Sequence, residues 1–407
     1  MNILFIHQNF PGQFKHLAPA LVSAGHDVTA LTLATNKLQY WLGVRLIPYS
    51  LTRANTKDVH PWVLDFESKV IRAEACLKAA DALRNSGYRP DIIISHPGWG
   101  ESLFLKDIWP DAKLKIYCEF FYHAHGLDVG FDKEFPTTSS IDFARVNLKN
   151  ANILLHFEQA DEGLSPTNWQ ASTFPKHIRD RISVIHDGID TKIIKPYPAV
   201  SFTLDTGKKF TRKDEIITFV NRTLEPYRGF HIFMRSLPKI LSGKPNAQVI
   251  IVGKEGVGYG TQPPNKSSWK TQFSEEVMPL LTAQQRERIH FIKYLDYARY
   301  LNLLQVSRVH VYLTYPFVLS WSLIEAMSAG CAIIASDTQP LQEAIKHDQT
   351  GKLFDFFDPS ALADSALRLL ENEDERSRLG KAAREFAKTN YDLSEHCLPR
   401  QIQWVIR

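Results

Sequence analysis

Residues 315–337 read Tyr-Pro-Phe-Val-Leu-Ser-Trp-Ser-Leu-Ile-Glu-Ala-Met-Ser-Ala-Gly-Cys-Ala-Ile-Ile-Ala-Ser-Asp. This stretch predicts a turn after a strand, a helix that begins near Ser320 or Trp321, and a second strand directly after Gly330. The first N–H groups of a helix lack partners and the peptide dipoles add, so the turn is suited to a phosphate. Glu325 lies in the first or second helical turn, where ribose hydroxyls are a plausible target for its carboxylate. The stretch therefore predicts a nucleoside-diphosphate site.

The same alternation of apolar strands and amphipathic helices runs outward from this stretch. Strands are predicted at residues 2–7, 27–32, 44–49, 91–95, 114–120, 151–157, 182–185, 215–221, 248–252, 289–292, 309–313 and 331–335, and helices at 12–24, 62–86, 230–241, 297–305 and 341–346. Continuous apolar strands between helices are typical of parallel sheets covered on both faces. We therefore expect an α/β fold with two doubly wound, Rossmann-like halves and a ligand site in the cleft between them.

Length supports this division, because 407 residues exceed the ~250–300 that one hydrophobic core can hold. The charged stretch near residues 190–213 marks the join. We predict a first domain at residues 1–195, a second at 196–390, and a last helix at 391–407 that packs back on the first domain.

Composition excludes several classes of protein. Hydrophobic content of 44% and charged content of 23% are those of a globular protein without a disordered signature. A net charge of +4 is too small for a typical nucleic-acid binder, although local basic clusters leave peripheral contact with anionic lipid open. The opening run reads as a buried strand rather than a signal peptide, no apolar run reaches the ~18–20 residues of a membrane span, and the four cysteines lack metal or disulfide spacing. We expect a cytoplasmic protein, with the inner face of the membrane as an open alternative.

Three further segments accompany the Glu325 turn in a recognisable order. They are Ile182-Ser-Val-Ile-His-Asp-Gly-Ile-Asp190, Val220-Asn-Arg-Thr-Leu-Glu-Pro-Tyr-Arg-Gly229 and Val249-Ile-Ile-Val-Gly-Lys254. Their order and spacing resemble the retaining nucleotide-sugar glycosyltransferases of family 4, which have the two-domain GT-B architecture. The resemblance is strong from about residue 182 to 390 and lies mostly in the layout before that.

The resemblance implies roles for the second half. Arg222 matches an arginine that binds the donor diphosphate, and Arg228 stands where the family usually has lysine before glycine. Both would stabilise the leaving phosphates and so act catalytically. Glu325 matches the second glutamate of the family's Glu-x7-Glu motif, which resembles a ribose-binding carboxylate, whereas Phe317 replaces the first, sugar-contacting glutamate. The backbone N–H groups of three residues are expected at the phosphate or sugar: Val318, Leu319 and Ser320.

The first half carries weaker matches. Gly12, in a loop that opens a helix, would let the backbone approach the pyrophosphate or the sugar. His96 resembles the histidine that often ends the family's fourth strand, and Glu119 is the nearest polar match to a histidine after the next one. A carboxylate in an apolar strand requires a partner or a task, so Glu119 is assigned to acceptor orientation and catalysis. Acceptor binding is assigned to His96, Glu119, Tyr122 and His123.

These features and the family resemblance together imply transfer of a sugar from a nucleoside-diphosphate sugar to an acceptor hydroxyl, with retention at the anomeric carbon. The acceptor is left open among glycans, lipid-linked sugars and small molecules. Since arginines can neutralise the phosphates, no metal and no cofactor are expected. Two alternatives remain: a nucleotide-sugar 2-epimerase, which also breaks the anomeric C–O bond, and a non-catalytic nucleotide-sugar binding subunit, which the Phe317 replacement motivates. A nicotinamide dehydrogenase is disfavoured because neither half carries Gly-x-Gly-x-x-Gly after its first strand.

Overall fold

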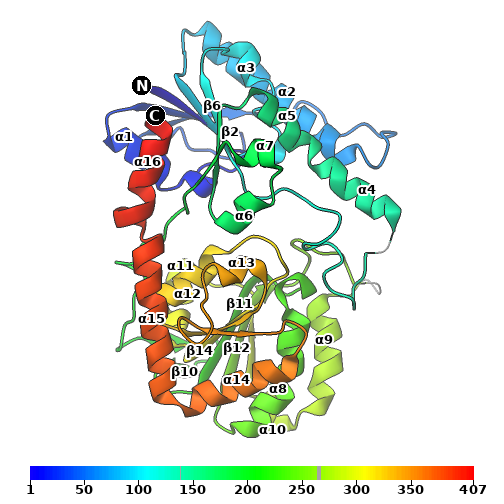
Figure 1. The fold of residues 1–407 in the computed structure, drawn as a ribbon, viewed down its shortest axis with the longest axis vertical. Coiled ribbons are helices and arrows are strands. Elements are labelled where there is room, and N and C mark those ends of the chain that lie inside the picture. The colour runs from blue at the N-terminus through cyan, green and yellow to red at the C-terminus, as the bar shows by residue number, and fades with distance from the viewer. Residues whose placement is uncertain (138, 264–266) are drawn as a thin grey trace. The chain divides into compact units, whose positions relative to one another are not determined.

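The computed structural model describes residues 1–137, 139–263 and 267–407. They form two compact domains, each a parallel sheet covered by helices (Figure 1). The first domain comprises Met1–Asp187 and Ser394–Arg407, and the second comprises Gly188–Leu393. The division thus falls after Asp187, a few residues earlier than the sequence predicted, and the chain rejoins the first domain at Ser394.

The first domain contains an eight-stranded sheet in the order β3-β4-β2-β1-β5-β6-β7-β8, parallel throughout except for the β3–β4 edge pair. Its strands are β1 Asn2–Ile6, β2 Asp27–Leu33, β3 Tyr40–Trp41, β4 Val44–Tyr49, β5 Ile92–Ser95, β6 Lys113–Tyr117, β7 Glu162–Ser165 and β8 Ile182–Val184. Its helices are η1 Gly12–Phe14, α1 Leu17–Ser23, α2 Leu64–Asn85, η2 Pro97–Trp99, α3 Leu105–Ile108, α4 Ser140–Lys149, α5 Ala151–Gln159, α6 Asn168–Ser172, α7 Lys176–Arg179 and α16 Leu398–Ile406.

Alternation along β1 shows how this sheet is buried on both faces. Ile3 and Phe5 pack into one core with α1 and α16, whereas Leu4 and Ile6 pack into the opposite core with α2 and α5. Successive strand residues point to opposite faces, so an all-apolar strand requires a helical layer on each side. The run Ile-Leu-Phe-Ile therefore specifies a central strand.

The C-terminal helix α16 belongs to the first domain, as the sequence predicted. Trp404 and Val405 lie in the same core as Ile3 and Phe5. The ammonium group of the fully buried Lys115 donates to the carbonyl of Trp404 at 2.5 Å and lies 5.1 Å from the centre of its ring. Apolar burial and a cation–π contact together hold the end of the chain on the sheet.

The second domain contains a six-stranded parallel sheet in the order β13-β12-β11-β14-β15-β16 and a β9–β10 hairpin. Its strands are β9 Ser201–Thr203, β10 Lys209–Thr211, β11 Ile216–Thr223, β12 Gln248–Lys254, β13 Ile289–Ile292, β14 Val309–Tyr312, β15 Ala332–Ser336 and β16 Lys352–Phe354. Its helices are η3 Pro226–Arg228, α8 Phe230–Gly243, α9 Trp269–Val277, η4 Met278–Leu280, α10 Ala283–Arg286, α11 Tyr297–Val306, α12 Trp321–Ser328, α13 Gln339–Gln342, α14 Pro359–Glu371 and α15 Glu373–Tyr391, with η5 Leu393–Cys397 leading into α16.

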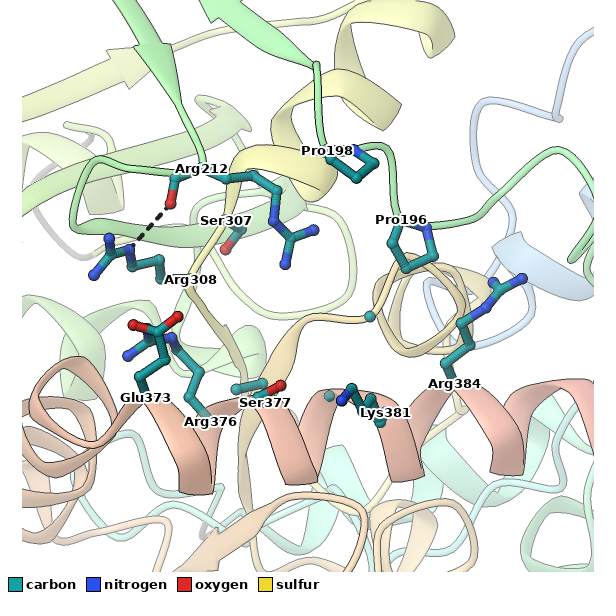
Figure 2. Close-up of a pocket in the computed structure, with 13 residues that line it drawn as sticks. Pro196, Pro198, Arg212, Ser307, Arg308, Glu373, Arg376, Ser377, Lys381 and Arg384 are labelled. Carbon is teal, nitrogen blue, oxygen red and sulfur yellow. Dashed lines mark hydrogen bonds and ion pairs between the residues drawn. The ribbon is translucent and has the colours of Figure 1, made fainter.

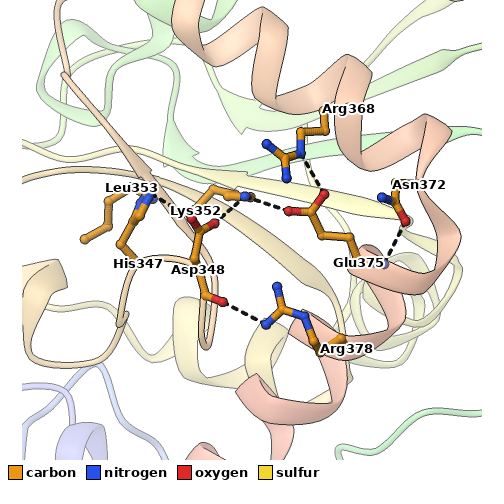
Figure 3. A network of polar contacts seen from close by, with 8 residues as sticks. All are labelled: His347, Asp348, Lys352, Leu353, Arg368, Asn372, Glu375 and Arg378. Atoms are coloured by element: carbon orange, nitrogen blue, oxygen red, sulfur yellow. Dashed lines mark hydrogen bonds and ion pairs between the residues drawn. The ribbon is translucent and has the colours of Figure 1, made fainter.

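A network of ion pairs joins three elements of this domain. Lys352 on β16, which is 5% exposed, binds Glu375 on α15 at 2.7 Å and also pairs with Asp348. Arg368 on α14 binds the second carboxylate oxygen of Glu375 at 2.8 Å (Figure 3). The hydrogen bond from Lys352 is the largest of the effects that hold the pKa of Glu375 below its usual range. Each buried charge here has a carboxylate or a cation as its partner, as a buried ion requires.

Four predicted elements differ from the structure. The strand predicted at 114–120 ends at Tyr117, as β6, so Glu119 lies beyond the strand and is exposed rather than buried. Residues 151–157, predicted as a strand, form helix α5 instead: Asn152, Ile153, His156 and Phe157 are buried at helical spacing while Leu154 and Leu155 are exposed. A short apolar run cannot be assigned by periodicity alone, and the true strand is the short β7. The helix predicted at 12–24 is divided into η1 and α1, and the helix predicted at 341–346 ends earlier, as α13.

Candidate functional site

The order of strands in the second domain locates a ligand crevice. From β11 the chain winds outward to β12 and β13, and from β14 it winds the other way to β15 and β16. Since β11 and β14 are neighbours, the turns that follow them flank the point where the winding reverses. In doubly wound sheets, ligands bind at the carboxyl ends of the strands at this point. The two turns contact each other directly, because the N–H of Tyr315 donates to the carbonyl of Tyr227 at 3.1 Å.

Arg228 stands in the turn after β11 and is the most unusual charge in the domain. It is 7% exposed, and its guanidinium donates to the hydroxyl of Thr314 at 2.9 Å and approaches that of Tyr312 at 3.5 Å. The guanidinium lies 5.1 Å from the centre of the Tyr259 ring. Within the described part of the chain no carboxylate pairs with it. A buried cation with neutral partners is costly, and an anion bound beside it would offset that cost.

Arg222 lies at the carboxyl end of β11 and, unlike Arg228, is not buried. Its side chain is exposed and forms no hydrogen bond or ion pair with the residues that the structure describes. The predicted pair of cations therefore consists of one fixed guanidinium and one that is free to move to a ligand.

Gly229 fixes the geometry between Arg228 and helix α8. Its φ is +67°, and a Cβ at this position would stand 2.4 Å from the Cβ of Leu313. Glycine adopts this conformation without strain and leaves room for the β14 turn. The Arg-Gly sequence thus places the guanidinium against the neighbouring strand.

Glu225 is a site residue that the sequence reasoning missed. It is completely buried, accepts from the hydroxyl of Thr223 at 2.5 Å, and accepts from the backbone N–H groups of Gly258, Tyr259 and Gly260 at 3.0–3.3 Å. This carboxylate fixes the loop that places Tyr259 over Arg228. Its position between the two arginines was visible in the sequence, but its backbone partners lie more than thirty residues away.

Phe317 lies inside an aromatic cluster beside Arg228. Its ring is 5.3 Å from that of Tyr227 in an edge arrangement and 5.0 Å from that of Tyr259, and Tyr315 packs on Tyr227 at 4.8 Å. Phe317 is 5% exposed, and Val318 and Leu319 are 8% and 7% exposed. Where the resemblance implies a sugar-contacting carboxylate, this chain has apolar packing around its buried guanidinium.

The start of α12 follows the prediction closely. Ser320 is the N-cap, its hydroxyl accepts from the N–H of Ser322 at 3.3 Å, and its own N–H donates to the hydroxyl of Tyr312 at 3.2 Å. Tyr312 therefore contacts both Arg228 and the start of α12. The helix N-terminus and the guanidinium belong to one hydrogen-bonded group of residues.

Glu325 lies in α12 and is 7% exposed. Its two oxygens accept from the hydroxyls of Tyr297 at 2.8 Å and Tyr300 at 2.9 Å, both on α11. Burial, and then the negative charge of Glu325, raise the pKa of both tyrosines above their usual value, so they remain protonated donors. An ionised carboxylate has about four acceptor positions, so each oxygen keeps one for a further hydroxyl. The tyrosines were missed because α11 is distant in the sequence.

The first domain has a matching reversal between β1 and β5. After β1, His7 accepts from the N–H of Asn9 through Nδ1 at 3.0 Å, so its Nε2 donates to Gln13 at 2.9 Å. Burial, followed by the neighbouring His96, lowers the pKa of His7 to about 4. Gly12 has a φ of +49°, and a Cβ there would stand 2.3 Å from Nε2 of His7. The glycine thus makes room for the His7 ring.

His96 follows β5 and faces Glu119. Its Nδ1 accepts from the N–H of Gly98 at 3.1 Å, so the neutral ring carries its proton on Nε2. Nε2 is buried without a hydrogen bond to the described residues, and the nearest carboxylate oxygen, Oε2 of Glu119, is 3.6 Å away. The His96 ring stacks on Tyr117 at 5.4 Å and packs on Trp99 at 4.7 Å. A buried N–H donor therefore points toward a carboxylate that is 47% exposed.

A cavity of 260 Å³ adjoins His96 and Glu119, and Tyr122 also lines it. The backbone of Tyr122 exchanges two hydrogen bonds with Asn150 at 2.9 and 2.7 Å. His123, in contrast, donates through Nε2 to the carbonyl of Thr173 at 2.7 Å, which fixes its ring. Three of the four residues assigned to the acceptor thus share one cavity, and His123 is bound to the backbone.

Comparisons with known proteins agree with this architecture. The family described as Glycosyl transferase family 4 group matches residues 24–194, and Glycosyl transferases group 1 matches residues 203–386. The chain is a glycosyltransferase with a family 4 group domain followed by a group 1 domain. It is 28% identical over 222 residues to D-inositol 3-phosphate glycosyltransferase of Corynebacterium glutamicum, a match that covers 52% of this chain and 48% of that protein. The chain spans about half the length of the first curated relatives it matches.

Solved structures show the same fold over nearly the whole chain. Sucrose-phosphate synthase from Thermosynechococcus elongatus aligns with a TM-score of 0.72 and 19% identity, covering 99% of this chain and 98% of that one. Anabaena HepE, solved in complex with UDP-glucose, aligns with a TM-score of 0.68 and 15% identity over 99% and 98% of the two chains. This chain thus has the GT-B architecture of two Rossmann-like domains. Among the described residues, no helix has the length and apolarity needed to cross a bilayer.

Proposed function

We propose that this glycosyltransferase moves a sugar from a nucleoside-diphosphate sugar to an acceptor hydroxyl, with retention at the anomeric carbon and without a divalent metal. The observation that carries the proposal is Arg228, a buried cation with neutral partners at the reversal point of the second sheet. The complex of HepE with UDP-glucose, and the named activities of the relatives, support a nucleotide-sugar donor.

In the proposed reaction the bond between the anomeric carbon and the β-phosphate oxygen breaks, and its electron pair leaves with the diphosphate. Arg228, Arg222 and the N-terminus of α12 stabilise the charge that develops there. The acceptor oxygen forms the new bond on the same face, and its proton goes to the departing phosphate oxygen. Retention without a covalent intermediate requires no protein nucleophile near the anomeric carbon, in contrast to retaining glycosidases.

The carboxylate of Glu325 is proposed to accept hydrogen bonds from the ribose of the donor, oriented by Tyr297 and Tyr300. In the first domain, the cavity beside His96 and Glu119 is proposed to receive the acceptor. The Nε2–H of His96 has no strong partner among the described residues, so it is available to an acceptor oxygen, and the Glu119 carboxylate would accept from a hydroxyl.

The test begins with a thermal-shift screen of UDP, GDP, ADP and their sugar conjugates. A ligand at a concentration 100 times its Kd raises the free energy of unfolding by about 2.7 kcal/mol, which such a screen detects. The preferred diphosphate and its 2′,3′-dideoxy analogue are then titrated against wild type and Glu325→Ala. If Glu325 binds the ribose, the analogue binds wild type roughly 10-fold more weakly, and the variant no longer distinguishes the two ligands. Equal discrimination by both proteins would remove the ribose role.

Metal independence is tested separately on the purified enzyme. Turnover should be unchanged by EDTA, because the proposed cations of the site are arginines. Loss of activity in EDTA that Mg²⁺ or Mn²⁺ restores would contradict this part of the proposal.

A non-catalytic nucleotide-sugar binding subunit is the second candidate, and the packing of Phe317 where the family resemblance implies a glutamate favours it. The variant Phe317→Glu distinguishes the two functions. A transferase that has replaced the glutamate should lose activity when a charge enters the aromatic cluster, whereas a binding subunit has no activity to lose and shows donor binding without transfer to any acceptor tested.

A further inference from the structure

A cavity in the second domain lies at the amino ends of the strands, on the edge of the sheet opposite the Arg228 site. Its volume is 440 Å³, and residues directly before β14 and at the start of β15 line it, among them Ser307, Arg308 and Ala332. In a parallel sheet all amino ends share one edge, so this cavity is separate from the carboxyl-end crevice. The proposed sugar transfer does not use the residues of this cavity.

The cavity is lined by cations from two directions. Arg376, Lys381 and Arg384 lie on one face of α15, at helical spacing, and Figure 2 shows them with the side chains of Arg212 and Arg308 across the cavity. Glu373 is the one acidic residue in its lining; it is 83% exposed and lies 3.7 Å from Arg376. Five cations therefore face one anion.

The guanidinium groups are held by backbone carbonyls rather than by carboxylates. Arg308 donates to the carbonyls of Arg212 and Lys213 at 3.2 and 2.7 Å. Arg376 donates to those of Leu369 and Leu370 at 2.8 and 3.3 Å. Arg384 likewise donates to Ile194, Ser328 and Thr191 at 2.5–3.3 Å, and Arg212 donates to Gln305 at 3.3 Å. These hydrogen bonds fix the positions of the guanidinium groups, but neutral carbonyls do not cancel their positive charges.

A purely structural reading explains part of this arrangement. The carbonyls of Leu369, Ser328 and Gln305 lie at the ends of α14, α12 and α11, and arginines there neutralise helix dipoles. Each helix end carries roughly −0.5 of a charge, so three of them remove about one and a half positive charges from the cavity. With Glu373 subtracted, roughly two to three of the five positive charges are left. Capping therefore does not account for Lys381 and Arg308.

The Glu375 network described above provides the contrast within the same domain. There, Lys352 and Arg368 share carboxylates at 2.7–2.8 Å. In the cavity, burial and then the neighbouring cation Arg308 lower the pKa of Arg376, and the carboxylates of Glu373 and Glu215 offset this only in part. The chain thus pairs Lys352 and Arg368 with a carboxylate in one place, and leaves partly buried and exposed cations facing one another in the other.

Glycines bring the walls of the cavity together. A Cβ on Gly380 of α15 would stand 2.5 Å from the carbonyl oxygen of Gly330, and one on Gly330 would stand 2.9 Å from the ring of Pro196. Gly330 also has a φ of +78°. Close approach of α15 to the β15 turn therefore shapes a defined pocket rather than a loose surface of basic residues.

We infer that this cavity is a second anion site, for a phosphate-bearing ligand with two or more negative charges, built on Arg212, Arg308, Arg376, Lys381 and Arg384. Guanidinium groups bind phosphate oxygens through paired hydrogen bonds, and a pocket of this volume lies within the ~300–1,000 Å³ range of ligand sites. The phosphate belongs either to a free metabolite or to an anionic lipid headgroup, and both present the same chemistry.

Inorganic pyrophosphate is the first probe, titrated calorimetrically against the full chain. Because pyrophosphate also fits the donor site, the measurement is made in the Arg222→Ala background, where that site is weakened. The double substitution Arg308→Ala with Lys381→Ala should lower the affinity of the remaining site roughly 10-fold or more. The matched control is Arg286→Ala with Lys209→Ala, which removes a carbonyl-bound arginine and an exposed lysine elsewhere in the domain.

Equal losses in both double variants would show a general charge effect and overturn the site, as would wild-type affinity in the cavity variant. Arg308 anchors the loop at Arg212, so the single change Lys381→Glu, at an exposed residue, repeats the test without disturbing that anchor. Vesicles of phosphatidylglycerol and of phosphatidylcholine then separate the sources. Cosedimentation with the anionic vesicles that Lys381→Glu abolishes identifies a lipid headgroup, and pyrophosphate binding without cosedimentation identifies a free phosphate. Neither behaviour in the wild-type protein would refute the inference.

Discussion

Replacement of Arg228 by methionine should remove donor binding while leaving the protein folded. Methionine fills a similar volume without a charge. The substitution loses the hydrogen bond to Thr314 at 2.9 Å, which is worth about 1.5–3 kcal/mol for a charged donor, and a cation–π contact with Tyr259 of about 0.5–2 kcal/mol. It also removes the desolvation penalty of a buried charge, which is several kcal/mol. These contributions oppose each other, so the free energy of unfolding should change by less than about 2 kcal/mol.

For ligand binding, no favourable contribution offsets the interactions that Arg228→Met removes. A nucleoside diphosphate that pairs with Arg228 loses charge-assisted hydrogen bonds, so its dissociation constant should rise roughly 100-fold, and kcat/KM should fall by roughly 10²–10³. Calorimetric titration with the preferred diphosphate measures the first quantity, and denaturant unfolding measures the stability. Arg235→Met is the matched control, because Arg235 is a surface arginine that binds Glu276 at 2.5 and 3.0 Å.

Two results would refute the reasoning. An Arg228→Met protein that binds the diphosphate as tightly as wild type would show that the guanidinium does not contact it. A variant destabilised by more than about 3 kcal/mol would show that Arg228 supports the fold, because its hydrogen bonds then outweigh its burial.

Three further predictions follow from single contacts. Gly229→Ala should destabilise by about 2–4 kcal/mol, whereas Gly207→Ala, which also has a positive φ but no atom within 4 Å of the added Cβ, should cost about 1 kcal/mol; denaturant unfolding compares them. Tyr300→Phe should weaken diphosphate binding roughly 2- to 10-fold through Glu325, and the exposed Tyr294→Phe should not, as calorimetry would show. Burial lowers the pKa of His156 from 6.5 to about 4, so between these pH values the unfolded chain binds more protons than the folded one. The free energy of unfolding should therefore fall as the pH drops from 6.5 to 4. His156→Gln should reduce that slope by up to about 1.4 kcal/mol per pH unit, as thermal unfolding would show.

The sequence was informative where local pattern and structure agree. Continuous apolar strands such as residues 2–6 and 248–254 can only be central in a sheet covered on both faces, and the Ser320 turn has its own capping signal. Residues 151–157 were mistaken for a strand because the exposure of Leu154 and Leu155 depends on tertiary packing. A short apolar run carries no information on which of its residues will face solvent.

The candidate site divided along the same line. Arg228 and Glu325 were predicted as site residues from local motifs, and the structure adds what surrounds them: Tyr259 over the guanidinium, and two tyrosines on the carboxylate. The role of Glu225 could not be predicted, because its backbone partners belong to the loop that follows β12 in the sequence. Long-range partners of this kind follow from topology rather than from sequence spacing.

The measurement that tests the donor assignment most directly is a crystal structure with the preferred nucleoside diphosphate. Phosphate oxygens should lie at about 2.7–3.2 Å from the guanidinium of Arg228, with the ribose hydroxyls on the carboxylate of Glu325. A nucleotide bound elsewhere, with Arg228 still donating only to Thr314 and Tyr312 and Glu325 only accepting from its two tyrosines, would contradict the assignment.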